Sequence, residues 1–81
     1  MEREELLKRI SINPGVCFGK PCVRGTRIWV SLILDNLAAG MPEKELLEDY
    51  PALRHEDILA AIAYGAKMSR ERYVPLLIDR N

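Results

Sequence analysis

The positions of glycine and proline divide this 81-residue chain into two parts that must fold differently. From Asn13 to Gly25 a glycine or proline occurs every few residues, and such a segment is too interrupted to form a helix. After residue 30 the interruptions are farther apart, at Gly40, Pro42 and Pro51, and leave room for helices between them. This spacing predicts turns and short strands first, followed by helices.

A small β-ribbon is predicted within the first 30 residues. Ile10-Ser11-Ile12 alternates in the manner of a brief strand, and Asn13-Pro14-Gly15 predicts a type II turn whose glycine takes a positive φ. The segment from Val23 to Ile28 is expected to form a hairpin around Arg24-Gly25. The charged residues 1–9 are expected to form a short helix or a frayed arm.

Three helices are predicted between residues 31 and 72. The first ends at Gly40, which suits the left-handed position after a helix. The second has Pro42 as its first helical residue and stops before Pro51, and the third starts near His55. The apolar stripe of the first helix, at i, i+3, i+4 and i+7, consists of Val30, Ile33, Leu34 and Leu37.

The expected fold is therefore mainly α: a small N-terminal β-ribbon followed by a tri-helical helix-turn-helix unit. The chain is shorter than the usual ~100–200 residues of a domain, so 1–81 should form a single domain and not a multi-step enzyme. It comprises an arm and ribbon (1–30), the three-helix unit (31–72) and an apolar tail (73–81). An ordinary three-helix cluster without a ligand is the alternative.

The net charge is zero, but the charges are unevenly distributed. Residues 1–30 hold six basic and three acidic residues, 31–60 hold two and seven, and 61–81 hold four and two. Nucleic acid could contact the basic ends, whereas the acidic middle would repel phosphate. The acidic residues between 43 and 49 fit a solvated helix face better than a metal-dependent nuclease site.

Two elements are candidates for DNA contact. A two-stranded ribbon can enter a major groove, and the third helix occupies the place of a recognition helix. Glu56 and Asp57 count against the helix, because they lie where base-contacting residues normally project. The alternative for the ribbon cations is solvated loop charges paired with the acidic middle. The candidates are Lys20, Arg24 and Arg27 on the ribbon and Arg54 and His55 at the helix start.

The third helix also suggests an interface. Its run from Ile58 to Ala66 contains no charge and surrounds the helix, which predicts that more than one side is covered. We expect a homodimer contact there, with the small residues allowing close approach. The alternative is that the chain wraps its own ribbon and tail around the helix. The candidate interface residues are Ile58, Ala61, Ile62 and Gly65.

No cofactor, metal or catalytic group is predicted. Gly19-Lys20-Pro21 resembles a phosphate loop only superficially, because Pro21 stands where Ser or Thr should hold Mg²⁺. Cys17, Cys22 and His55 are too few for a structural zinc site, so we expect two buried, reduced thiols. The chain has no apolar run of ~18–20 residues and starts with charged residues, which predicts a cytoplasmic protein without membrane contact.

Several motifs resemble a bacterial and archaeal family catalogued as domain of unknown function 433, over about Ile10 to Arg72. The resemblance implies a homeodomain-like or winged-helix-like fold. Its members are similar to VapB-type antitoxins and are often encoded beside a PIN-like nuclease toxin. The motifs are Asn13-Pro14, Gly19-Lys20-Pro21, Gly25-Thr26-Arg27-Ile28, Gly40, Tyr50-Pro51 and Glu56-Asp57-Ile58.

The function that the resemblance implies is a non-enzymatic antitoxin that dimerises, binds operator DNA and neutralises a toxin through its C-terminal tail. Arg70, Arg72 or Arg80 could then pair with the acidic metal site of a PIN nuclease. A stand-alone DNA-binding regulator and a structural dimer module are the alternatives. The tail residues expected to bind the partner are Tyr73, Val74, Leu76, Leu77 and Ile78.

Overall fold

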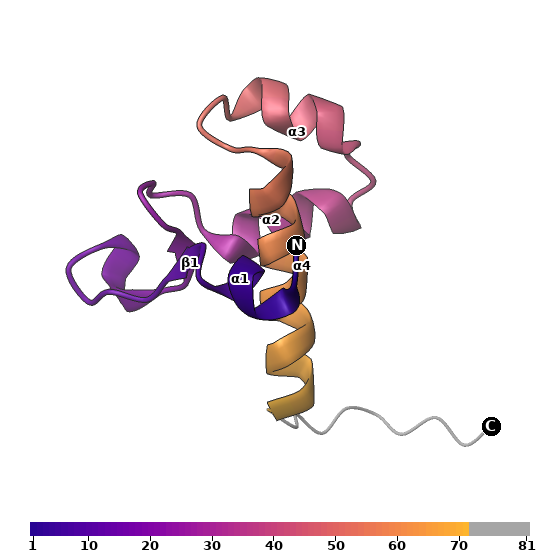
Figure 1. Ribbon diagram of the computed structural model, residues 1–81. Helices are drawn as coiled ribbons and strands as arrows, with labels where there is room; N and C mark the ends of the chain where they lie inside the picture. The colour runs from indigo at the N-terminus through magenta and orange to yellow at the C-terminus, as the bar shows by residue number, and fades with distance from the viewer. Residues whose placement is uncertain (72–81) are drawn as a thin grey trace, which may run out of the picture.

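Short helices and a two-stranded ribbon gather around one long helix in the computed structural model, which describes residues 1–71 (Figure 1). The predicted mainly α architecture with a small ribbon is confirmed. No helix within residues 1–71 combines the length and the apolar character needed to cross a membrane. The elements in chain order are α1 (Arg3–Leu7), β1 (Ile10–Ser11), the 3-10 turn η1 (Cys17–Gly19), β2 (Cys22–Val23), α2 (Val30–Ala38), α3 (Glu43–Asp49) and α4 (His55–Glu71).

The ribbon joins two segments that are distant in sequence. β1 and β2 pair antiparallel, with Ile10 opposite Val23 and Ser11 opposite Cys22. The predicted hairpin around Arg24-Gly25 is present as a tight turn, closed by the Thr26 N–H donating to the Val23 carbonyl at 3.0 Å. The sequence indicated this turn but not the pairing of β2 with β1.

The turn after β1 differs from the prediction. The Val16 N–H donates to the Asn13 carbonyl at 2.9 Å, so a turn does form. Gly15 is not among the residues with positive φ, however, and the prediction of a type II turn is therefore wrong. The Asn13 side chain accounts for the difference, because its Oδ1 accepts the Gly15 N–H at 2.8 Å and holds an Asx turn instead.

The ends of α2 and α3 follow from local chemistry. Gly40 has φ +93°, and the Gly40 and Met41 N–H groups donate to the Leu37 and Asn36 carbonyls, both at 3.0 Å. This pattern is a Schellman motif, so the predicted end at Gly40 is confirmed. Pro42 is the N-cap of α3 and not, as was predicted, its first helical residue, because its ψ of 149° is extended.

The core is formed where α2, α3 and α4 meet. Ile33, Leu46 and Ile58 contribute one fully buried side chain from each helix. α1 packs along α4 and α2 packs on it as well, so helices of the same chain cover much of the apolar run of α4 (Figure 1). The sequence predicted that a second copy, or the chain's own ribbon and tail, would cover this run. Within residues 1–71, α1 and α2 cover much of it, and β1 of the ribbon contacts α4 as well.

Candidate nucleic-acid interface

Arg24 fastens the ribbon to the end of α1. Its Nε donates to the Lys8 carbonyl at 2.8 Å and its Nη2 donates to the Ile10 carbonyl at 3.0 Å. A guanidinium has five N–H groups, and these two bonds leave others of this exposed side chain for an anion. Arg24 therefore combines a structural role with a positive charge at the ribbon surface.

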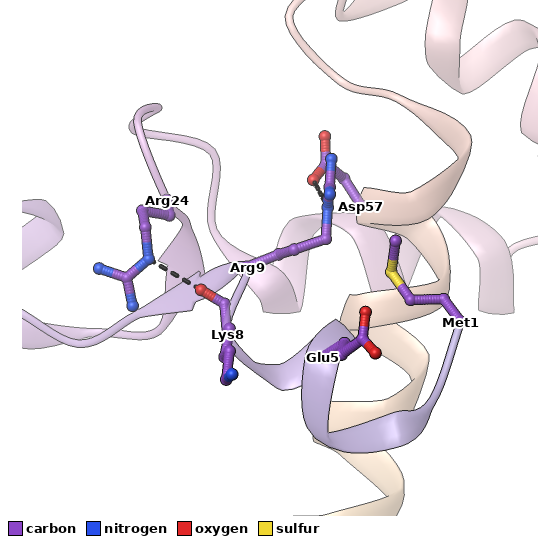
Figure 2. Close-up of a pocket in the computed structure, with 6 residues that line it drawn as sticks. All are labelled: Met1, Glu5, Lys8, Arg9, Arg24 and Asp57. Carbon is purple, nitrogen blue, oxygen red and sulfur yellow. Dashed lines mark hydrogen bonds and ion pairs between the residues drawn. The ribbon is translucent and has the colours of Figure 1, made fainter.

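A hollow lined by three basic and two acidic side chains lies between the ribbon, α1 and the start of α4. Its volume is ≈ 570 Å³, and Figure 2 shows Arg24 at one side and Asp57 at the other. Arg9 crosses the hollow, where its Nε donates to Asp57 Oδ1 at 2.9 Å. The hollow is lined by Met1, Glu5, Lys8, Arg9, Arg24 and Asp57.

Asp57 places the start of α4 at this hollow. It is only 5% exposed, and its Oδ2 accepts the Arg54 N–H at 2.9 Å, which caps the first turn of the helix. In the sequence, Asp57 counted against DNA contact by the third helix, and its pairing with Arg9 was not predicted. Nothing in the sequence signals a pair separated by 48 residues.

Arg54 and His55 lie beside this capped turn and are exposed. His55 Nδ1 lies 2.6 Å from Glu43 Oε2 of α3, so an acidic side chain already contacts this histidine. Of the predicted DNA-contact residues, only Arg24 lines the hollow. The start of α4 reaches the hollow through Asp57, and Arg54 and His55 are not among its lining residues.

The outer end of the ribbon carries the remaining cations. Lys20 Nζ lies 5.7 Å from the centroid of the Trp29 ring, a cation–π contact. Arg27 is exposed and lines a second hollow of ≈ 350 Å³ together with Phe18 and Trp29. Trp29 and Phe18 had no assigned role in the sequence.

The acidic side chains gather on another element. α3 has the sequence EKELLED, which contains four carboxylates and one lysine. Leu46 of this helix is fully buried, and the charged residues Lys44, Glu45, Glu48 and Asp49 are exposed. Phosphate would be repelled at this surface, so the ribbon side is the better place for nucleic acid.

The four predicted dimer residues lie in different environments. Ile58 and Ala61 are buried within the chain itself. A Cβ on Gly65 would lie 3.1 Å from Leu34 Cδ1, so the close approach at this glycine is to α2. Ile62 is 48% exposed, and Leu59 on the same helix is exposed as well. Of the four predicted residues, Ile62 is therefore the one that a second molecule could cover, with the neighbouring Leu59, which was not predicted.

The two cysteines are free and buried. Burial raises the pKa of the Cys22 thiol above its ordinary value of 9.0, and a hydrogen bond with the Cys17 side chain raises this pKa further. Residues 1–71 hold no group of three or more His, Cys, Asp or Glu side chains placed to share a metal ion. The predicted partner-binding residues Tyr73, Val74, Leu76, Leu77 and Ile78 lie outside the described part of the chain.

A comparison with known families identifies the relatives of this chain. A family model described as "Protein of unknown function (DUF433)" matches residues 10–65. The chain belongs to the DUF433 family. A crystal structure of a DUF433 member protein from Anabaena variabilis is 40% identical and superposes with a TM-score of 0.73, covering 84% of this chain and 67% of that one. No curated protein matches this DUF433 chain.

The matched region contains most of the candidate site. Residues 10–65 include the ribbon cations, the exposed Phe18 and the start of α4. α1 precedes this region, so Lys8 and Arg9 enter the hollow of this DUF433 protein from outside the matched segment.

Proposed function

We propose that this DUF433 protein is a non-enzymatic, antitoxin-like DNA-binding protein that regulates its own operon and neutralises a PIN-like nuclease toxin. The observation that supports DNA binding is the separation of charge. Lys20, Arg24 and Arg27 are exposed on the ribbon, whereas the carboxylates gather on α3, which contacts the start of α4 through Glu43 and His55. Exposed cations on the ribbon provide the electrostatic contact that a DNA backbone requires.

The ribbon is the more suitable of the two DNA elements. The exposed residues in the first half of α4 include Leu59 and Ile62, which offer no hydrogen bonds to base edges. The ribbon carries Lys20, Arg24 and Arg27, and these side chains can contact phosphate. We therefore assign DNA contact to the ribbon.

The apolar face of α4 suits contact between protein chains. Leu59 and Ile62 lie one turn apart on this helix and are both exposed. A homodimer formed through this face would bring two ribbons to one DNA molecule and would double the positive surface. Dimerisation is therefore part of the proposed function.

DNA binding is tested by a mobility-shift titration with the duplex upstream of the protein's own gene. The proposal expects a retarded complex that weakens steeply as salt is added, because phosphate contacts release counterions. A duplex of unrelated sequence at the same salt concentration measures the nonspecific part. Absence of any complex at low salt would contradict DNA binding.

The toxin-binding part of the proposal rests on the family resemblance and on the apolar segment from Tyr73 to Ile78. Apolar tails of this kind can bury area on a partner, and Arg70 could pair with acidic groups of the nuclease. Co-expression with the neighbouring gene product tests this part, and removal of residues 73–81 should abolish a complex. A complex that survives the deletion would contradict the assignment to the tail, and DNA binding without any complex would indicate a stand-alone regulator.

A further inference from the structure

Phe18 is the most exposed large apolar residue described in this chain. Its side chain is 91% exposed and lies in η1, at the turn that leads into the ribbon strand β2. An aromatic side chain in this position loses the stabilisation that burial would give it. The stability of the isolated chain therefore does not explain why Phe18 is exposed.

The backbone holds Phe18 in an unusual conformation. Cys17, Phe18 and Gly19 have φ values of 54°, 56° and 77°, three consecutive residues in the left-handed region. Residues other than glycine rarely adopt this region, and such positions cluster where function requires them. Here the conformation directs the Cys17 side chain into the interior and the neighbouring Phe18 into solvent.

Hydrogen bonds fix the conformation of this turn. The Gly19 N–H donates to the Val16 carbonyl at 3.1 Å, and the Lys20 N–H donates to the Cys17 carbonyl at 3.0 Å. The side chain of Cys17, next to Phe18, is buried. These hydrogen bonds and the buried Cys17 side chain hold the turn in place around Phe18.

A cationic and an aromatic side chain line the same hollow as Phe18. It shares a hollow with Arg27 and Trp29, and the ring of Trp29 is in turn contacted by Lys20. Positive charges beside an exposed aromatic ring are the combination by which proteins hold a nucleic-acid backbone and contact the bases next to it.

We propose that Phe18 is an apolar wedge that inserts between two base pairs of the DNA bound by the ribbon. This inference rests on the proposed DNA binding and adds the mode of contact. Arg27 and Lys20 hold the backbone on either side of the insertion. The inserted ring partly unstacks one base step and bends the duplex, and steps that unstack easily, such as TpA, are favoured.

The test uses a duplex with a central TpA step and a 2-aminopurine base next to it, which becomes brighter when it is unstacked. The full-length wild type should bind this duplex and raise the fluorescence. Phe18→Ala should bind about tenfold more weakly, without the fluorescence rise but with an unchanged salt dependence, because a stacking contact is lost and no phosphate contact is.

Two further variants complete the experiment. Ile12→Ala removes another exposed apolar side chain from the ribbon region and should leave the fluorescence rise intact. Phe18→Leu keeps an apolar wedge and should retain most of the rise, which also guards against a folding defect specific to the alanine variant. Circular dichroism establishes that each variant is folded.

The possible failures are distinguishable. Wild-type protein that binds the duplex in a salt-dependent manner without a fluorescence rise would overturn the wedge and leave DNA binding intact. The same conclusion would follow if folded Phe18→Ala gave the full rise, or if folded Phe18→Leu behaved like Phe18→Ala. Wild-type protein that does not bind the duplex at low salt would overturn both the wedge and the proposed DNA binding.

Discussion

Arg9 Nε donates to Asp57 Oδ1 at 2.9 Å and so joins the end of α1 to the first turn of α4. The second oxygen of the same carboxylate accepts the Arg54 N–H at 2.9 Å. One buried side chain thus positions the N-terminal segment and caps the central helix. Arg9 and Asp57 both line the hollow between the ribbon, α1 and α4.

Replacement of this carboxylate should destabilise the fold. Asp57→Ala removes a helix cap and a charged hydrogen-bond partner of Arg9, and should lower the free energy of unfolding by about 2–4 kcal/mol. Urea denaturation measures the change. Asp49→Ala, which removes an exposed carboxylate, should change stability by no more than about 0.5 kcal/mol. Equal effects of the two variants would contradict the structural role of Asp57.

The end of α2 depends on a residue that tolerates positive φ. Gly40→Ala should cost about 1–2 kcal/mol, because an alanine at φ +93° is strained although its Cβ would meet no atom within 4 Å. Thermal unfolding compares it with Gly15→Ala, a glycine without positive φ, which should be neutral or slightly stabilising. A Gly40→Ala protein as stable as wild type would show that α2 does not end in a Schellman motif.

The buried thiol of Cys22 predicts a dependence of stability on alkaline pH. Its pKa is raised on folding, so the unfolded chain releases the proton at a lower pH than the folded chain does. The free energy of unfolding should therefore fall as the pH rises above about 9, the value at which the thiol of the unfolded chain ionises. Urea denaturation under reducing conditions measures this slope.

Cys22→Ala serves as the control for that slope. The variant leaves a cavity and will be less stable at every pH, so the comparison concerns the change with pH and not the absolute value. Its free energy of unfolding should fall less steeply above about pH 9 than that of the wild type. Parallel curves for the two proteins would contradict a raised pKa at Cys22.

The exposed apolar face of α4 predicts self-association. Ile62→Glu should weaken a dimer at least about tenfold, because it would place an unpaired charge in the contact. Sedimentation velocity gives the oligomeric state, and Ser31→Glu, which adds the same charge at an exposed position of α2, should leave it unchanged. A wild-type protein that is strictly monomeric at micromolar concentration would contradict the dimer.

Local signals predicted the helices well. The glycine after α2 fixes the end of that helix through short-range geometry that the sequence displays. Pro42 was placed one position too late, because a proline is compatible with both the N-cap and the first helical position. The mainly α architecture followed from these signals.

The sequence contains no local signal for the long-range contacts. The pairing of Ile10 with Val23 and the contact of Arg9 with Asp57 connect segments that only the folded core brings together. The positive φ of Phe18 was not predicted, because residues other than glycine rarely adopt a positive φ. The ribbon cations were predicted as a set, but the use of two Arg24 donors for backbone carbonyls was not.

Arg24 is for this reason a poor probe of DNA contact, since its replacement would also loosen the ribbon. Arg27 is exposed, and within residues 1–71 its side chain forms no hydrogen bond. Its removal therefore changes the charge with little effect on the fold. Lys44 on the acidic α3 is a matched control, because it is also an exposed cation but lies on the surface that should not face DNA.

The central claim is that the ribbon contacts the DNA backbone, and the salt dependence of the dissociation constant tests it most directly. For the duplex upstream of the protein's own gene, Arg27→Ala should weaken binding and reduce the slope of log K against log salt by about 1 for each Arg27 in contact. Lys44→Ala should match the wild type in both quantities. Unchanged affinity and slope in Arg27→Ala, with binding intact, would contradict the claim.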